Sequence, residues 1–238
     1  MAKYGLKEVA DVIFFDIATG KPVLFFDSLK TSSLENTADS TAATGGRGNG
    51  QLVVWNYGRK ATLKMQDALL SPNSIALLSG NDVSTQEINL SGREVVTGAT
   101  SVNITETAVG DKISVWELKD GVISQEVSGA TVSGKAVSGL SEGKQYMVFY
   151  EYKAPAGTKT ITFSTDKFPG TYRVVGDTVV KSAATGKDHR AQFLIKKAQL
   201  KAAFNFTMEA ENVSTFDFEL EVLRDDATTD LYTIAIVE

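Results

Sequence analysis

Residues 216–222, FDFELEV, alternate apolar and acidic side chains without a break. Successive side chains of a β-strand point to opposite faces of the sheet, so this period of two predicts a strand with one core face and one acidic face. Further long strands are predicted at residues 160–164, 172–180, 192–197, 200–209 and 231–237. The fold class is therefore expected to be mainly β, with long strands in the last third of the chain.

Two apolar runs near the start of the chain predict a hairpin. Residues 12–15 and 23–26 flank a segment containing Gly20 and Pro22, which both favour a turn. Both runs are continuously apolar, so we expect both of their faces to be covered. Residues 52–66 then resume an alternating pattern with a break at Gly58, which predicts a bent strand or a strand pair.

One short helix is predicted at residues 71–80. Ser71 is a favoured N-cap residue, Pro72 suits the first helical position, and Gly80 suits the position just past the helix end.

The middle of the chain, residues 83–153, has a different texture. Short β-prone pieces recur at regular spacing, and Asp120-Gly121 is a typical hairpin turn between two of them. Several short strands so spaced predict a small immunoglobulin-like β-sandwich. We interpret it as an inserted domain, with residues 1–82 and 154–238 forming one discontinuous core domain.

Residues 28–50 are rich in Ser, Thr, Asn, Ala and Gly, and predict a long loop. Ordering a backbone costs roughly 1–2 kcal/mol per residue, and this composition cannot bury enough apolar surface to offset that cost. We therefore expect the loop to be mobile on its own. Its order would have to come from a partner on which Leu29 and Leu34 could dock.

The composition excludes several classes of protein. The formal net charge is −5, from 24 Lys and Arg against 29 Asp and Glu, and the basic residues form no stripe, which disfavours specific binding to the outside of a nucleic acid. The chain has no cysteine, so disulfides and thiolate chemistry are excluded. No apolar run reaches the length of a signal peptide or membrane span, so a cytoplasmic product without a membrane partner is expected.

No catalytic, cofactor-binding or metal site is predicted, and we expect a protein that is not an enzyme. The only histidine, His189, lies in a polar segment interpreted as a turn, without a nucleophile elbow in the chain. The glycine-rich residues 45–50 lack the Lys-Ser/Thr ending of a phosphate-binding loop. Residues 225–230 lack the spacing of a calcium loop, and Glu209 with Glu211 lacks the opposed geometry of glycosidase carboxylates.

Several segments together resemble the tail tube proteins of tailed phages. They are GGRGN followed by LVVWNYGR at residues 45–59, DALLSP at 67–72, FPGTYRVVG at 168–176, TMEAE at 207–211 and STFD at 214–217. The resemblance covers roughly the first and last thirds of the chain, and the middle does not share it.

The resemblance implies a β-sandwich core domain with one short flanking helix. It also implies a structural virion protein of the phage tail, assembled in the host bacterial cytoplasm. Its copies would stack as hexameric rings, with a joined inner β-barrel lining the channel through which double-stranded DNA passes without specific binding. The other implied partners are the tail initiator or baseplate, the terminator, and sheath or tape measure proteins. The long loop of the family bridges subunits and rings, so the candidate assembly residues here are Leu29, Leu34, Gly45, Gly46, Arg47, Gly48 and Asn49.

A negative channel wall would not hold DNA phosphates, and the candidate lumen-lining residues are Asp16, Glu209 and Glu211. Two alternatives remain open from the sequence. The first is the inner tube of a contractile injection particle that delivers protein or opens a membrane. The second is a carbohydrate-binding β-sandwich, which Trp116 and the tyrosines of the middle segment would support.

Overall fold

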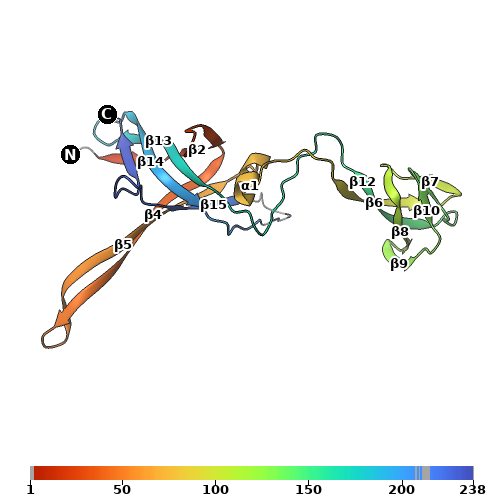
Figure 1. The fold of residues 1–238 in the computed structure, drawn as a ribbon, viewed down its shortest axis with the longest axis horizontal. Helices are drawn as coiled ribbons and strands as arrows, with labels where there is room; N and C mark the ends of the chain where they lie inside the picture. Colours follow the sequence, from red (N-terminus) through yellow and green to blue (C-terminus); the bar gives the residue numbers. More distant parts are fainter. Residues whose placement is uncertain (1–2, 207, 209, 211–214, 238) are drawn as a thin grey trace. The chain divides into compact units, whose positions relative to one another are not determined.

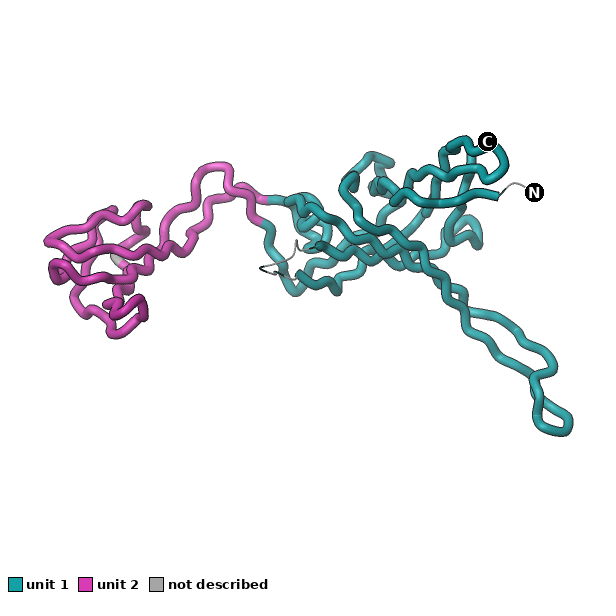
Figure 2. The backbone as a smooth tube through the Cα atoms, turned by 180° about the vertical axis from the view of Figure 1, so that it is seen from behind, with its two compact units in different colours: residues 1–83, 161–238 teal, residues 84–160 magenta. Residues whose placement is uncertain are grey.

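The computed structural model describes residues 3–206, 208, 210 and 215–237 (Figure 1). The chain forms two compact units, coloured separately in Figure 2. Unit 1 holds residues 1–83 and 161–238, and unit 2 holds Ser84–Thr160. Unit 2 extends past residue 153 because Ala154 N–H donates to Ile88 O and Ser84 pairs with Thr160, which keeps both connecting segments together.

The described part of unit 1 is built on one nine-stranded antiparallel sheet in the order β3-β2-β13-β14-β15-β5-β4. Strand β1 also pairs with β13, and β16 pairs with β14. The bounds are β1 Tyr4–Leu6, β2 Asp11–Asp16, β3 Pro22–Phe26, β4 Leu29–Gly45, β5 Gly50–Asp67, β13 Thr171–Ser182, β14 Asp188–Leu200, β15 Phe216–Val222 and β16 Thr233–Ile236. The predicted mainly β class is confirmed, with a single sheet around the core of unit 1 instead of two facing sheets.

The core of unit 1 lies on one face of this sheet. Phe14, Leu63 and Phe218 come from strands far apart in the sequence, and all three are buried together. In β15, Phe218, Leu220 and Val222 are buried, whereas Glu219 on the other face pairs with Lys201 at 2.6 Å. The alternation predicted for residues 216–222 is therefore confirmed.

Helix α1, Pro72–Ser79, is the only helix among the described residues. Ser71 Oγ accepts from Ser74 N–H and Ser74 Oγ accepts from Ser71 N–H, each at 3.0 Å, which satisfies two donors that a helix start leaves open. At the other end Gly80 adopts φ 69° and donates to Ala76 O. The predicted helix and both of its ends are confirmed.

Two predicted strands are wrong. Residues 161–164 form no strand, and β14 ends at Leu200, so residues 201–206 are irregular. The aromatic side chains there pack on one another: the Phe163 and Phe204 ring centroids are 5.3 Å apart, and those of Phe204 and Phe206 are 4.8 Å apart. The apolar pattern thus reflects an aromatic cluster against the core and not a strand pairing.

Unit 2 is a small antiparallel sandwich with its own core. Val115, Val137 and Val148 fill the space between a four-stranded sheet, β6-β12-β8-β9, and a three-stranded sheet, β10-β11-β7. The bounds are β6 Asn89–Thr97, β7 Ser101–Asn103, β8 Ala108–Lys119, β9 Val122–Glu126, β10 Thr131–Ser133, β11 Ala136–Ser138 and β12 Gln145–Lys153. Asp120 and Gly121 both have positive φ and form the predicted turn between β8 and β9.

The strand order of unit 2 differs from that of an immunoglobulin constant domain. In that domain the first strand pairs with the second, and the third pairs with the sixth. In unit 2 the first strand, β6, pairs with the seventh, β12, and β12 also pairs with the third, β8. Strand spacing predicts the number of strands but not their partners. The observed sandwich therefore supports the predicted β-sandwich without supporting the immunoglobulin pairing.

Two of the three tyrosines of unit 2, the side chains that would support carbohydrate binding, are core residues. Tyr146 and Tyr150 are only 2% and 5% exposed. The Tyr150 hydroxyl donates to the Glu94 carboxylate, and burial together with this hydrogen bond raises the pKa of Tyr150 to about 12. These two rings are not available to stack on a sugar.

We predict that Gly176→Ala destabilises unit 1. Gly176 lies opposite Phe193 in the β13–β14 ladder, and a Cβ at residue 176 would lie 2.0 Å from Phe193 Cζ. Overpacking of this kind costs about 1–3 kcal/mol, measured as the free energy of unfolding in urea. Gly5→Ala is the control, because nothing lies within 4 Å of its added Cβ. Equal stability of the two variants would contradict this packing.

Candidate assembly surface

Strands β4 and β5 form a hairpin that extends away from the rest of unit 1 (Figures 1 and 2). Strand β5 pairs with β15 only through Ala61 to Asp67, and β4 is the last strand of the sheet. Within the part of the chain that the structure describes, residues 37–60, which we call the arm, are therefore paired only with one another. They form a two-stranded ribbon with two open backbone edges.

The arm exposes large apolar side chains on both faces. Leu52, Val53, Val54, Trp55 and Tyr57 are each about half exposed or more, with Trp55 at 54% and Leu52 at 68%. Their cross-strand neighbours are small, since Thr41 lies opposite Trp55, and Ala42 and Ala43 lie opposite Val54 and Val53. A lone ribbon cannot bury these side chains, and contiguous exposed apolar surface of this kind marks an interaction site.

The prediction that residues 28–50 form a loop without regular structure is wrong. Residues 29–45 are strand β4, and only residues 46–49 turn, with positive φ at Gly46, Gly48 and Asn49. The composition of this segment would predict disorder only if the segment had to bury apolar surface of its own. Instead, the backbone ladder with β5 orders it, and its threonines suit a strand.

Leu29 lies elsewhere than predicted, because it is 8% exposed and belongs to the core of its own subunit. Leu34 is only partly buried against the same core and lines a cleft beside the hairpin. Both residues lie at the base of the hairpin and not at its far end. The remaining candidate assembly residues, Gly45, Gly46, Arg47, Gly48 and Asn49, lie at the far end of the arm.

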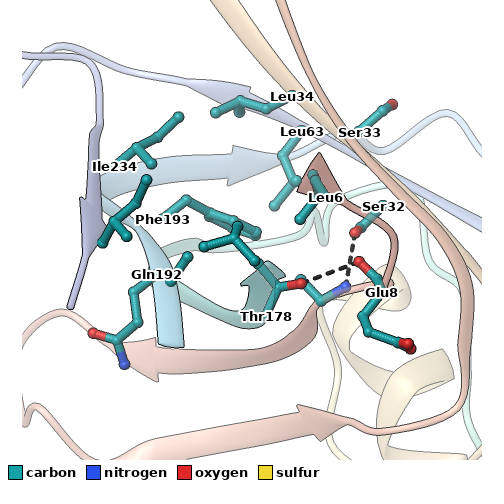
Figure 3. A pocket seen from close by; sticks show the side chains of 14 residues that line it. Leu6, Glu8, Ser32, Ser33, Leu34, Leu63, Thr178, Gln192, Phe193 and Ile234 are labelled. Carbon is teal, nitrogen blue, oxygen red and sulfur yellow. Dashed lines mark hydrogen bonds between the residues drawn. The ribbon is translucent and has the colours of Figure 1, made fainter. Parts of the chain in front are cut away.

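An apolar cleft of about 210 Å³ lies beside the base of the hairpin (Figure 3). Leu34 of β4 and Leu63 of β5 form one wall, and Phe193 of β14 and Ile234 of β16 form another. Two hydrogen bonds brace the cleft: Ala10 N–H donates to Ser32 Oγ at 3.2 Å, and Thr178 Oγ1 donates to Glu8 O at 3.0 Å.

The rim of the cleft is apolar and open. Leu6 is 68% exposed and Ile234 is 62% exposed, and both belong to short strands beside the cleft. Because the Ser32 and Thr178 hydroxyls are already engaged with the backbone, the cleft mainly offers apolar contact. It is suited to receive an apolar group and not to perform chemistry.

The model of the YomU/Tube protein family matches residues 4–234. The chain belongs to this family of phage tail tube proteins. The match runs through unit 2 as well, whereas the resemblance noted in the sequence was confined to the first and last thirds. A search of curated proteins found no match. The arm and the cleft are thus features of a structural component of the phage tail.

The candidate lumen residues of this tube protein are only partly described. Asp16 Oδ1 accepts from both the N–H and the Oγ1 of Thr19 at 2.7 Å, and these hydrogen bonds lower the pKa of Asp16. Its carboxylate therefore closes the β2–β3 turn and stays charged. Glu209 and Glu211 lie outside the described residues.

The face of β15 predicted to be acidic carries mixed charge in the tube protein. Glu219 pairs with Lys201, and its strand neighbour Lys64 pairs with Glu35 at 2.8 Å. Lysines from other segments therefore balance part of the acidic alternation. The sequence pattern of β15 alone could not show this, because Lys64 lies in β5 and Lys201 follows the end of β14.

No catalytic constellation forms in the described part of the tube protein. His189 lies within β14 and not in a turn, its Nδ1 is 3.1 Å from Val237 O, and its ring meets Tyr4 edge-on. Asp225 pairs with Lys196 at 2.9 Å. No group of three His, Cys, Asp or Glu residues that could hold a metal ion, and no helix able to span a membrane, is found among the described residues.

We predict that the arm exchanges its amide hydrogens faster than its base in the free subunit. Residues 38–57 are held by one partner strand outside the core, whereas residues 61–67 lie between β4 and β15. Hydrogen exchange followed by mass spectrometry measures both segments in one sample. Equal protection of the two segments in the monomer would contradict the assignment of the arm.

Proposed function

We propose that this tube protein self-assembles into stacked hexameric rings whose channel conducts double-stranded DNA into the host. The observation that carries the proposal is the arm, a projecting ribbon with apolar side chains on both faces and no partner strand beyond the hairpin itself. The resemblance to tail tube proteins and the family match support the same reading.

The arm favours open-ended assembly over a closed dimer. When one copy's arm lies on a different surface of the next copy, the contact is heterologous, and heterologous contacts generate rings or filaments. A stacked tube needs such contacts within each ring and between rings. The two open backbone edges of the arm offer further contacts, because a strand of a neighbouring copy can hydrogen-bond to either edge.

The net charge of the chain and its division into two units support proposals about the channel wall and about unit 2. A net charge of −5 favours a negative channel wall, to which Asp16, Glu209 and Glu211 would contribute, and DNA would slide past without being retained. Unit 2 has its own core, so we propose that it is an accessory domain outside the channel. The tail partners of the whole protein would be the initiator, the terminator, and sheath or tape measure proteins. The protein would assemble in the bacterial cytoplasm and have no catalytic role.

The test is electron microscopy of the purified protein at high concentration. The parent protein should form hollow, regularly striated tubes. The variant V53T/W55T/Y57T should stay monomeric, because threonine keeps the strand but removes the apolar face of the arm. The matched control is V122T/I123T, which changes two exposed apolar residues of unit 2.

Circular dichroism and urea unfolding should show that all three proteins are folded. Tubes of normal repeat from the arm variant would contradict the role of the arm. A parent protein that forms no regular polymer, even with tail initiator present, would overturn the proposed function.

A further inference from the structure

We propose that the apolar cleft of one copy receives the side chain of Trp55 from the arm of a second copy. This inference rests on the proposed assembly and names both sides of one contact within it. It assigns an occupant to the cleft in Figure 3 and a receptor to the arm.

The size of the cleft fits one large side chain. Its volume is about 210 Å³. Sites for small molecules usually span about 300–1,000 Å³ and place several convergent polar groups around the ligand. In this cleft most of the lining side chains are apolar, although Glu8 and Gln192 also line it. The Ser32 and Thr178 hydroxyls are engaged with the backbone, and the Gln192 amide donates to Asp177. One aromatic side chain matches that space and chemistry better than a polar ligand.

Trp55 is the best-placed side chain of the arm to fill the cleft. Val53, Trp55 and Tyr57 share one face of β5, and Trp55 is the middle and largest of the three. Its neighbours on either side can then contact the rim at Leu6 and Ile234. A buried tryptophan flanked by smaller contacts is the usual anchor of a protein interface.

The occupant cannot be the copy's own Trp55. Leu63 lines the cleft, and Trp55 lies eight residues further out on the same strand. At about 3.3 Å per residue, these eight residues place Trp55 roughly 26 Å from Leu63. Pairing with β4 keeps the arm extended over this distance (Figure 1). Only another copy can bring its arm to this cleft.

The contact can be tested by cross-linking, because the chain has no cysteine of its own. Y57C places a thiol on the arm next to Trp55, and L6C places one on the rim of the cleft. The two variants are mixed, so that the expected bond forms only between copies, and are then assembled and oxidised. The expected product is a covalent dimer on a non-reducing gel.

Two controls make the result specific. Pairing Y57C with I123C tests an exposed apolar position in unit 2, and it should give no dimer. Adding W55A to the Y57C variant should lower the dimer yield at least about tenfold, because loss of an anchor residue of this kind weakens a contact by that factor or more. Unfolding curves establish that W55A leaves the subunit folded.

The outcomes separate this inference from the proposed function. Tubes without the Y57C–L6C bond, or with a bond to I123C instead, would overturn the inference and leave tube assembly standing. A Y57C–L6C bond without tubes would support the contact and reject the proposed function. Absence of both the bond and the tubes would reject both.

Discussion

The ladder of backbone hydrogen bonds between β4 and β5 continues past the edge of the core, and the rest of the assembly surface depends on it. At its base the hairpin is held by buried Leu29, Leu63 and Met65, which pack with Phe218 in unit 1. Beyond Ala61 no third strand among the described residues pairs with β5. The same two strands thus serve first as part of the core sheet and then as an arm that carries apolar side chains into solvent.

This arrangement separates folding from assembly. The base contributes to subunit stability because its apolar side chains are buried within one chain. The arm contributes little to subunit stability, because a two-stranded ribbon buries little surface by itself. Its apolar side chains are therefore available for the contacts between copies that we propose. The open cleft beside the hairpin base, formed by short strands from both ends of the chain, is the complementary feature on the same unit.

Local signals in the sequence predicted local structure well. Ser71, Pro72 and Gly80 define helix α1 because capping depends on residues three or four positions apart. The alternation in residues 216–222 predicted which side chains of β15 are buried. The continuous apolar residues 12–15 and 23–26 predicted strands β2 and β3. Their expected burial on both faces is incomplete within the subunit, because Val23 and Phe25 are exposed.

What the sequence could not predict depends on pairing between distant segments. Residues 29–45 are polar and small, so their own composition indicated a loop, and only the partner strand β5 orders them. The cleft could not be predicted from the sequence, because its lining residues are spread along the chain from Leu6 to Ile236. The aromatic residues that cluster around Phe204 have the sequence pattern of a strand but form none. The order of strands in unit 2 cannot be read from the spacing of strands along the chain.

The arm, in the assembly that we propose, is a contact between copies of this chain. A cryo-electron microscopy reconstruction of the assembled particle would test this contact, because it resolves the path of residues 37–60 in every copy. We expect each arm to lie against another copy, with its Trp55 buried there. Arms that project into solvent, or that fold back on their own subunit while the particle remains intact, would contradict it.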